Sequence, residues 1–378
     1  MAQDKDQKTL NVPPLRFTGF TDEWKECTIR DIAKIEKGNG ISKDQLSEEG
    51  DECILYGELY TKYKSEIIDE VYSKTKVDST KLMRSQANDV LIPCSGETAE
   101  DIATARCVKM EGILLGGDLN IMRFDKQDGA FMSYQLNGKR KYDIARVAQG
   151  VSVVHLYPEH LKSIKVVLPE LEEQQKIVNL LSLIDERIAT QNKIIEKLES
   201  LIKGIAHKVA GMGKPNIRMS ECLECTSSTL QESDVSEVGT YPVYGANGIV
   251  GYLNGYNTSD EAIYIIKDGS GVGSVSYVKG KCSATGTLNI LTAKQDYSLQ
   301  FLYYILKVFS FVPYKTGMAI PHIYFKDYGK AHIFCPSYSE QLKYAKFLST
   351  IDDKLLVEQN ILINLSLQKQ YLLLQMFI

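Results

Sequence analysis

A heptad repeat within residues 168–209 is the feature that most constrains how this chain can fold. Apolar residues recur there in alternating steps of four and three, and only Gln191 interrupts them. The apolar positions are Ile177, Leu181, Ile184, Ile188, Ile195, Leu198, Ile202 and Ile205. This spacing predicts a helix with one apolar stripe, which has to be buried against a second helix. At 1.5 Å per residue the stripe is about 42 Å long, so the helix is a rod.

The partner helix is predicted at the other end of the chain. Residues 335–377 repeat residues 168–210 at a constant offset of 167, with Glu358 in place of Gln191. The matching apolar positions are Tyr344, Leu348, Ile351, Leu355, Leu362, Leu365 and Leu372. We therefore interpret the chain as a tandem duplication in which two globular modules are each followed by one long helix.

Two helices joined through a compact module can pair antiparallel, and the repeat then relates the halves by a pseudo-twofold axis. Gln191 and Glu358 should meet near that axis. A polar layer in an apolar seam can fix the register of a coiled coil. The alternative is that both positions merely tolerate solvent.

Composition indicates an ordinary folded protein. Apolar residues make up 44% of the 378 residues and charged residues 24%, and no apolar run is long enough for a membrane helix. The first 14 residues are polar and predict a disordered arm, not a signal peptide. Eight cysteines without a disulfide-like spacing favour reduced thiols and a cytoplasmic location. Cys222 and Cys225 have the spacing of half a zinc site, but no second pair completes it.

The first module reads as short strands joined by turns. Apolar runs at 54–56, 89–92 and 113–124 are separated by Gly, Asn and Asp. Trp24, the single tryptophan, should anchor the beginning of the module on its core. A helix is expected over residues 130–142, with Phe131, Tyr134 and Leu136 facing inward.

The second module follows the same plan with a different sequence. Asn247-Gly248 between apolar runs predicts a β-hairpin. The glycine-rich stretch 267–274 resembles a nucleotide-binding loop, but an alternating apolar run follows it where a helix would be required, so we expect a turn. His155 and His322 match at the offset of 167, which favours a shared structural role.

Charge and motifs argue against an enzyme. Neither a P-loop nor a cofactor-binding βαβ unit occurs in usable context, and the acidic cluster at 97–101 has no lysine motif beside it. Residues 15–168 carry 22 basic and 25 acidic side chains, and residues 210–335 carry 10 of each. DNA binding would therefore depend on local clusters of basic residues or on a basic partner.

Four stretches carry a resemblance to a known family. VPPLRFTGFTDEW, LPELEEQQKIVNLLSLIDERI, YPVYGANGIVGY and the terminal LLLQMFI resemble the specificity (S) subunit of type I restriction-modification enzymes. The resemblance implies an α+β chain with two α/β target-recognition domains in a pseudo-twofold inverted arrangement, separated by an antiparallel coiled coil. It places the domains at 15–168 and 211–335 and the helices at 169–210 and 336–378, after an arm at 1–14.

The same resemblance implies a non-catalytic subunit that recognises a split, asymmetric target in double-stranded DNA. Such a chain binds no cofactor itself. It docks two modification (methyltransferase) subunits, which use S-adenosylmethionine, and through them restriction subunits, which use ATP and Mg²⁺. A seam of about 42 Å also slightly exceeds one turn of B-DNA, about 34 to 36 Å, which fits a spacer between two DNA-reading modules.

Candidate DNA-contacting residues combine phosphate-pairing lysines, polar aromatics and side chains able to hydrogen-bond base edges. In the first module they are Tyr56, Glu58, Tyr60, Lys62, Tyr63, Lys64, Lys81, Arg84, Ser95 and Thr98. In the second they are Tyr244, Asn247, Lys267, Ser270, Lys279 and Lys315. The alternative for any one of them is a half-buried strand residue or a solvated lysine.

The outer face of the first long helix is the candidate docking surface for the modification subunits. Its basic residues are Lys176, Arg187, Lys193 and Lys197. A competing hypothesis is a coiled-coil scaffold that binds proteins and does not act on DNA. An autonomous enzyme is disfavoured, because no Cys, His and acid grouping recurs at a family-like spacing.

Overall fold

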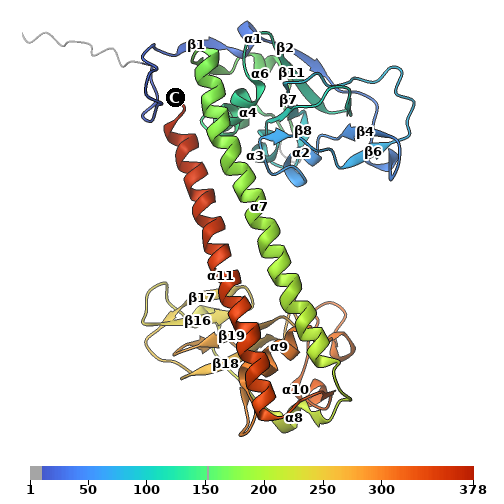
Figure 1. The fold of residues 1–378 in the computed structure, drawn as a ribbon, viewed down its shortest axis with the longest axis vertical. Helices are drawn as coiled ribbons and strands as arrows, with labels where there is room; N and C mark the ends of the chain where they lie inside the picture. The colour runs from blue at the N-terminus through green and yellow to red at the C-terminus, as the bar shows by residue number, and fades with distance from the viewer. Residues whose placement is uncertain (1–10, 151–152) are drawn as a thin grey trace, which may run out of the picture. The chain divides into compact units, whose positions relative to one another are not determined.

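A computed structural model describes residues 11–150 and 153–378, so most of the arm predicted at 1–14 lies outside the described residues. The chain divides into two compact units. The first comprises the chain up to Gln191 together with Ile361–Ile378, and the second is Asn192–Asn360. The long helices α7 (Leu171–Ala210) and α11 (Tyr338–Gln375) each contribute one part to each unit (Figure 1).

The first unit is built on a five-stranded sheet of order β2-β11-β7-β9-β5, beside a four-stranded sheet β10-β4-β6-β3. Its strands are β1 (Lys25–Thr28), β2 (Ala33–Lys37), β3 (Leu46–Ser47), β4 (Asp51–Ile54), β5 (Ile67–Ile68), β6 (Ser73–Thr75), β7 (Asp89–Pro93), β8 (Ser95–Gly96), β9 (Arg106–Val108), β10 (Leu114–Leu115), β11 (Leu119–Phe124), β12 (Val154–His155) and β13 (Lys165–Leu168). Its short helices are α1 (Ile29–Ile32), η1 (Lys43–Gln45), α2 (Glu58–Thr61), α3 (Ala99–Ile102), α4 (Gly129–Asn137), α5 (Lys141–Val147) and α6 (Pro158–Lys162).

The second unit is built on a four-stranded sheet of order β15-β21-β18-β19, beside a three-stranded sheet β17-β16-β20. Its strands are β14 (Ile217–Arg218), β15 (Leu223–Ser227), β16 (Tyr241–Gly245), β17 (Gly248–Leu253), β18 (Glu261–Ile266), β19 (Val275–Lys279), β20 (Ser283–Ala284), β21 (Leu288–Ala293) and β22 (His332–Ile333). Its short helices are α8 (Met219–Cys222), η2 (Glu232–Asp234), α9 (Leu299–Val308), η3 (Val312–Tyr314) and α10 (Phe325–Tyr328).

The two units share one plan, as the duplication predicted. In each, a long strand lies between two antiparallel neighbours: β11 between β2 and β7, and β21 between β15 and β18. Asn120 of β11 pairs with Ile92, and Asn289 of β21 pairs with Ile265. In each unit a four-residue helix, α1 or α8, follows a strand that pairs with one near the end of the module. The chain is thus α+β, with two β-rich modules and two long helices.

The core of the first unit confirms the role expected for Trp24. Its ring is 2% exposed and contacts Phe131 and Phe377 edge-on, with ring centroids 5.9 and 6.5 Å apart. The backbone N–H of Leu15 donates to the carbonyl of Gln375 at 2.9 Å. The segment before β1 is therefore packed against the end of α11.

The helix predicted at 130–142 is shorter in the structure. Phe131, Tyr134 and Leu136 are buried as expected, but α4 ends at Asn137. The Asn137 side chain accepts from the N–H of Ala105 at 2.8 Å and donates to its carbonyl at 2.9 Å. Gly138 follows with a non-helical ψ, and a separate helix, α5, begins at Lys141.

Within each unit α7 and α11 run antiparallel. In the first unit Asp185 contacts Lys369, while Glu173, nearer the start of α7, binds Arg16 beside the end of α11. In the second unit Ile202 and Leu355 line one cavity, whereas Tyr344, earlier in α11, reaches Met212 just beyond α7. The apolar stripe faces inward, with Ile177, Leu181, Ile184 and Ile202 buried.

Gln191 and Glu358 are buried, and Glu358 forms an ion pair with Lys354. They belong to different units, and their meeting near a pseudo-twofold axis remains a prediction. Within the described ranges, no helix is long and apolar enough to span a membrane, and no three His, Cys, Asp or Glu side chains gather as a metal site. All eight cysteines are described, and all are free thiols.

Candidate nucleic-acid interface

The second module joins two loops at the end of β18. The N–H of Ile323 donates to the carbonyl of Lys267 at 2.9 Å, and the N–H of Gly269 donates to Pro321 at 3.1 Å. The His322 Nδ1 lies 2.5 Å from Asp268 Oδ1. The turn after β18 and the loop before α10 therefore form one surface.

The first module builds the same junction from different residues. The N–H of Leu156 donates to Cys94 at 2.8 Å, and β8 pairs with β12 through Ser95 and His155. Residues 94–96 thus occupy the place of 267–269, an offset of 173. Two candidate segments that the sequence suggested separately are structurally equivalent.

The His155 and His322 backbones make equivalent hydrogen bonds in the two modules, and a shared structural role for the two side chains stays a prediction. His155 exchanges two hydrogen bonds with Gln149, at 2.9 and 2.7 Å. His322 exchanges two with Thr316, at the same distances. Each imidazole also stacks on a tyrosine two residues later, Tyr157 or Tyr324.

The candidate segment at 56–64 in the first module borders a cavity. Its volume is about 720 Å³, and Tyr56, Glu58, Tyr60 and Lys62 line it together with Lys43. Glu58 is buried, accepting from the N–H of Leu55 at 3.0 Å and from Lys62 Nζ at 2.6 Å. Burial raises the pKa of Tyr60. The half-buried tyrosines and Lys62 thus form a wall held in place by a buried carboxylate.

The next residues divide into support and surface. Tyr63 is buried and stacks on Tyr72 with centroids 5.5 Å apart, while its carbonyl accepts from Arg106 at 3.0 Å. Lys64 is exposed, with its Nζ 3.1 Å from the carbonyl of Thr61. Lys64 is available to a phosphate in this geometry, and Tyr63 packs inside the module.

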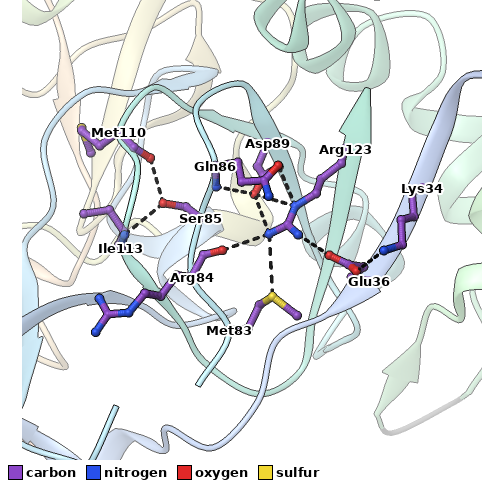
Figure 2. Close-up of polar contacts among 10 residues, drawn as sticks. All are labelled: Lys34, Glu36, Met83, Arg84, Ser85, Gln86, Asp89, Met110, Ile113 and Arg123. Carbon is purple, nitrogen blue, oxygen red and sulfur yellow. Dashed lines mark hydrogen bonds and ion pairs between the residues drawn. The ribbon is translucent and has the colours of Figure 1, made fainter. Parts of the chain in front are cut away.

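Arg84 lies on a loop that a polar network holds in place (Figure 2). Its carbonyl accepts from Arg123 at 2.9 Å, and Arg123 also binds Asp89 at 3.1 Å and Glu36. Burial raises the pKa of Asp89. The Arg84 guanidinium donates to the carbonyl of Gly112 at 2.7 Å, so the protein partly satisfies it. Lys81, on the same loop, is exposed.

Ser95 and Thr98 are placed differently from each other. Ser95 is buried, and its hydroxyl donates to Asp118 at 3.1 Å. Thr98 is exposed and caps α3 by accepting from the N–H of Asp101 at 3.1 Å. Ser95 therefore supports the turn from inside the module, and the Thr98 side chain is exposed to solvent.

Five of the six second-module candidates fall into two groups, and the sixth is Lys279. Lys267 and Ser270 lie on the turn after β18, and Lys315 precedes the loop hydrogen-bonded to it. The predicted turn is confirmed, since β19 follows it. Tyr244 and Asn247 lie on the β16–β17 hairpin, also confirmed, with Asn247 exposed in the turn.

Further residues of the second module combine a lysine with aromatic rings. Lys279 Nζ lies 5.5 Å from the ring centroid of Tyr277. Lys281 Nζ lies 4.9 and 5.9 Å from the rings of Tyr256 and Tyr241, which meet edge-on. The Lys281 cluster was not predicted from the sequence, because its members are separated in sequence. The interleaving of Tyr and Lys between 241 and 281 was the available signal.

The four docking candidates on α7 are all exposed: Lys176, Arg187, Lys193 and Lys197. The first two belong to the first unit and the last two to the second. Lys176 lies 4.7 Å above the ring of Phe20 and 3.5 Å from Glu172.

Comparisons with known proteins agree with this architecture. Residues 21–200 and 220–367 match the family described as the type I restriction modification DNA specificity domain. The chain is 28% identical over 212 residues to the MjaVIII specificity subunit of Methanocaldococcus jannaschii, covering 55% of this chain and 45% of that protein. It is 25% identical over 210 residues to a putative type I specificity subunit of Mycoplasma genitalium, covering 50% and 54%. The chain thus spans about half the length of these relatives.

Solved structures share the fold. The type I restriction-modification S subunit from M. genitalium matches with a TM-score of 0.68 at 20% identity, over 97% of this chain and 99% of that one. A chain from a structural study of type I complex assembly matches with a TM-score of 0.52 at 14% identity, covering 93% and 96%. Because the family match covers both modules and most of both long helices, this chain belongs to the family of type I restriction-modification DNA specificity subunits.

Proposed function

We propose that this chain is the non-catalytic subunit that sets the DNA target of a type I restriction-modification complex. Each module reads one half of a split, asymmetric site. The observation that carries the proposal is the equivalent junction of the two modules. The same junction has the buried Cys94 and Ser95 in the first module and Lys267 and Asp268 in the second, and the turn that follows presents Thr98 in the first module and Ser270 in the second. A common scaffold with different polar side chains suits the recognition of two different half-sites.

In this proposal phosphate contacts come from exposed lysines such as Lys64, Lys81, Lys279 and Lys315. Base contacts come from Tyr56, Tyr60, Thr98, Asn247 and Ser270. The buried Glu58, Tyr63 and Ser95 position these surfaces. The modules extend over 15–168 and 211–335, and the long helices set the distance between them, with Gln191 and Glu358 fixing their register.

The partners in the proposal are two modification subunits and, through them, restriction subunits. S-adenosylmethionine, ATP and Mg²⁺ act in those partners. The basic face of α7 docks the modification subunits.

Replacing both Arg187 and Lys193 with Glu should raise the dissociation constant of the complex with the modification subunits at least about tenfold, because each substitution replaces an attraction with a repulsion. Light scattering of the purified mixture measures it, with exposed Lys346→Glu on α11 as the control. If assembly is unchanged, the modification subunits dock on another surface of the chain.

The DNA proposal is tested by selection from a random duplex library with the assembled complex of this chain and its modification subunits. We expect enriched duplexes to share two specified segments separated by a gap of fixed length and free sequence. One uninterrupted motif would reject the split site. No enrichment at all would favour the competing hypothesis of a protein-binding scaffold.

A further inference from the structure

The loop Thr316–His322 of the second module presents large apolar side chains to solvent. Met318 is fully exposed, and Ile320 is 59% exposed. The neck of the loop is closed by the two backbone hydrogen bonds between Thr316 and His322. Gly317 has φ +87°, where a Cβ would lie 2.3 Å from the carbonyl oxygen of Ile320. The backbone therefore holds this apolar tip in a defined shape.

A cationic and aromatic rim surrounds the base of the loop. Tyr324 stacks on His322 at an interplanar angle of 17°, and Lys326 Nζ lies 5.2 Å from the Tyr324 ring. The Lys267 carbonyl accepts from the N–H of Ile323, the residue that follows the loop, and Lys315 immediately precedes the loop. The carboxylate at the base, Asp268, pairs with His322. An apolar tip with a basic rim matches the charge of a nucleic acid duplex.

The first module supplies an independent comparison. Gly150 also has positive φ, Gln149 and His155 close the same neck, and His155 stacks on Tyr157. Val153 is 52% exposed. In the residues that the structure describes, the closed neck and the positive-φ glycine are kept in both modules, although the other candidate surfaces of the two modules have diverged. A feature kept in both modules suits what both half-sites share, which is the backbone and the base stack.

We propose that Met318 and Ile320 form an apolar wedge that enters the minor groove of the second half-site, with Lys315 and Lys326 on the flanking phosphates. Apolar side chains used in this way partly unstack a base step and bend the duplex. This proposal rests on the proposed function of the chain. It assigns sequence-independent DNA distortion to a loop outside the candidate base-reading residues.

The test uses the full chain assembled with its modification subunits and the duplex obtained by selection. Met318→Ala with Ile320→Ala should weaken binding about tenfold or more, because two apolar contacts are lost. The dependence of affinity on salt should stay unchanged, since no phosphate contact is removed. Lys315→Ala should instead lower the slope of log affinity against log salt by about one. Val238→Ala, at a residue 83% exposed in the same module, is the control.

A second readout follows base unstacking. The fluorescence of 2-aminopurine, placed at successive positions of the second half-site, should increase when the wild-type complex binds. It should not increase when the double variant binds. Wild-type affinity within twofold for the double variant would overturn the wedge. The double variant could instead fail to assemble with the modification subunits while the assembled fraction binds DNA with unchanged affinity. That result would also overturn the wedge, because the loop would then contact a protein partner. If the wild-type complex binds no DNA, the proposed function fails together with the wedge.

Discussion

At the scale of single residues, a buried ion-pair cluster ties α11 to the first module. Lys369 Nζ lies 2.5 Å from both Glu66 and Asp185, and all three side chains are largely buried. Burial lowers the pKa of Lys369, but the two carboxylates outweigh it and raise the pKa above its ordinary 10.5. The contribution of this lysine to stability is therefore complete at neutral pH and is lost only as the pH rises above about 10.5.

Replacing Lys369 with Met should lower the free energy of unfolding of the first unit by about 3 to 5 kcal/mol, because two buried carboxylates lose their cation. Denaturant titration at neutral pH measures it. Lys346→Met, at an exposed position on the same helix, should change stability by less than about 0.5 kcal/mol. Equal effects of the two substitutions would contradict the assigned role.

At the scale of elements, one tyrosine in each module donates a hydrogen bond to an aspartate of a long helix. Tyr134 of α4 donates to Asp185 of α7 at 2.7 Å, and Tyr304 of α9 donates to Asp352 of α11 at 2.6 Å. The two aspartates match at the offset of 167, so these contacts are equivalent. Burial, reinforced by the neighbouring carboxylate, raises the pKa of both tyrosines, which keeps the phenols as donors.

Tyr134→Phe should destabilise the first unit by about 1.5 to 3 kcal/mol, because the buried Asp185 loses a charged hydrogen bond. Tyr304→Phe should cost less, about 1 kcal/mol, because the Asp352 side chain is 26% exposed and water can replace the phenol. Thermal unfolding of the full chain compares them, with exposed Tyr142→Phe as the control. A larger loss from Tyr304→Phe would reject the burial argument.

These elements show what the sequence could and could not predict. The apolar stripe, the duplication and the Asn247-Gly248 hairpin depend on local periodicity and turn chemistry, so they were predictable. The end of α4 depends on Asn137 bonding to Ala105, a contact between residues 32 apart. The difference in number between equivalent residues of the two modules also varies. It is 167 in the long helices, 173 at the loop junction and 190 between β1 and β14, so a constant offset did not reveal these equivalent residues. The base contacts depend on how the modules dock on DNA, and this geometry is defined only in the complex with DNA.

At the scale of the whole molecule, the long helices are proposed to set the spacer of the recognised site. Inserting one heptad into both α7 and α11 adds about 10 Å of helix, enough for a spacer longer by up to about three base pairs. Library selection with the altered complex measures the new spacer. An unchanged spacer would show that the helices do not set this distance.

The proposed function requires that this chain alone determines a two-part DNA target. Methylome sequencing of cells with and without the chain, in the presence of the modification subunit, tests it most directly. We expect one bipartite methylated motif that is present with the chain and absent without it. A methylome that does not change when the chain is removed would contradict this role of the chain.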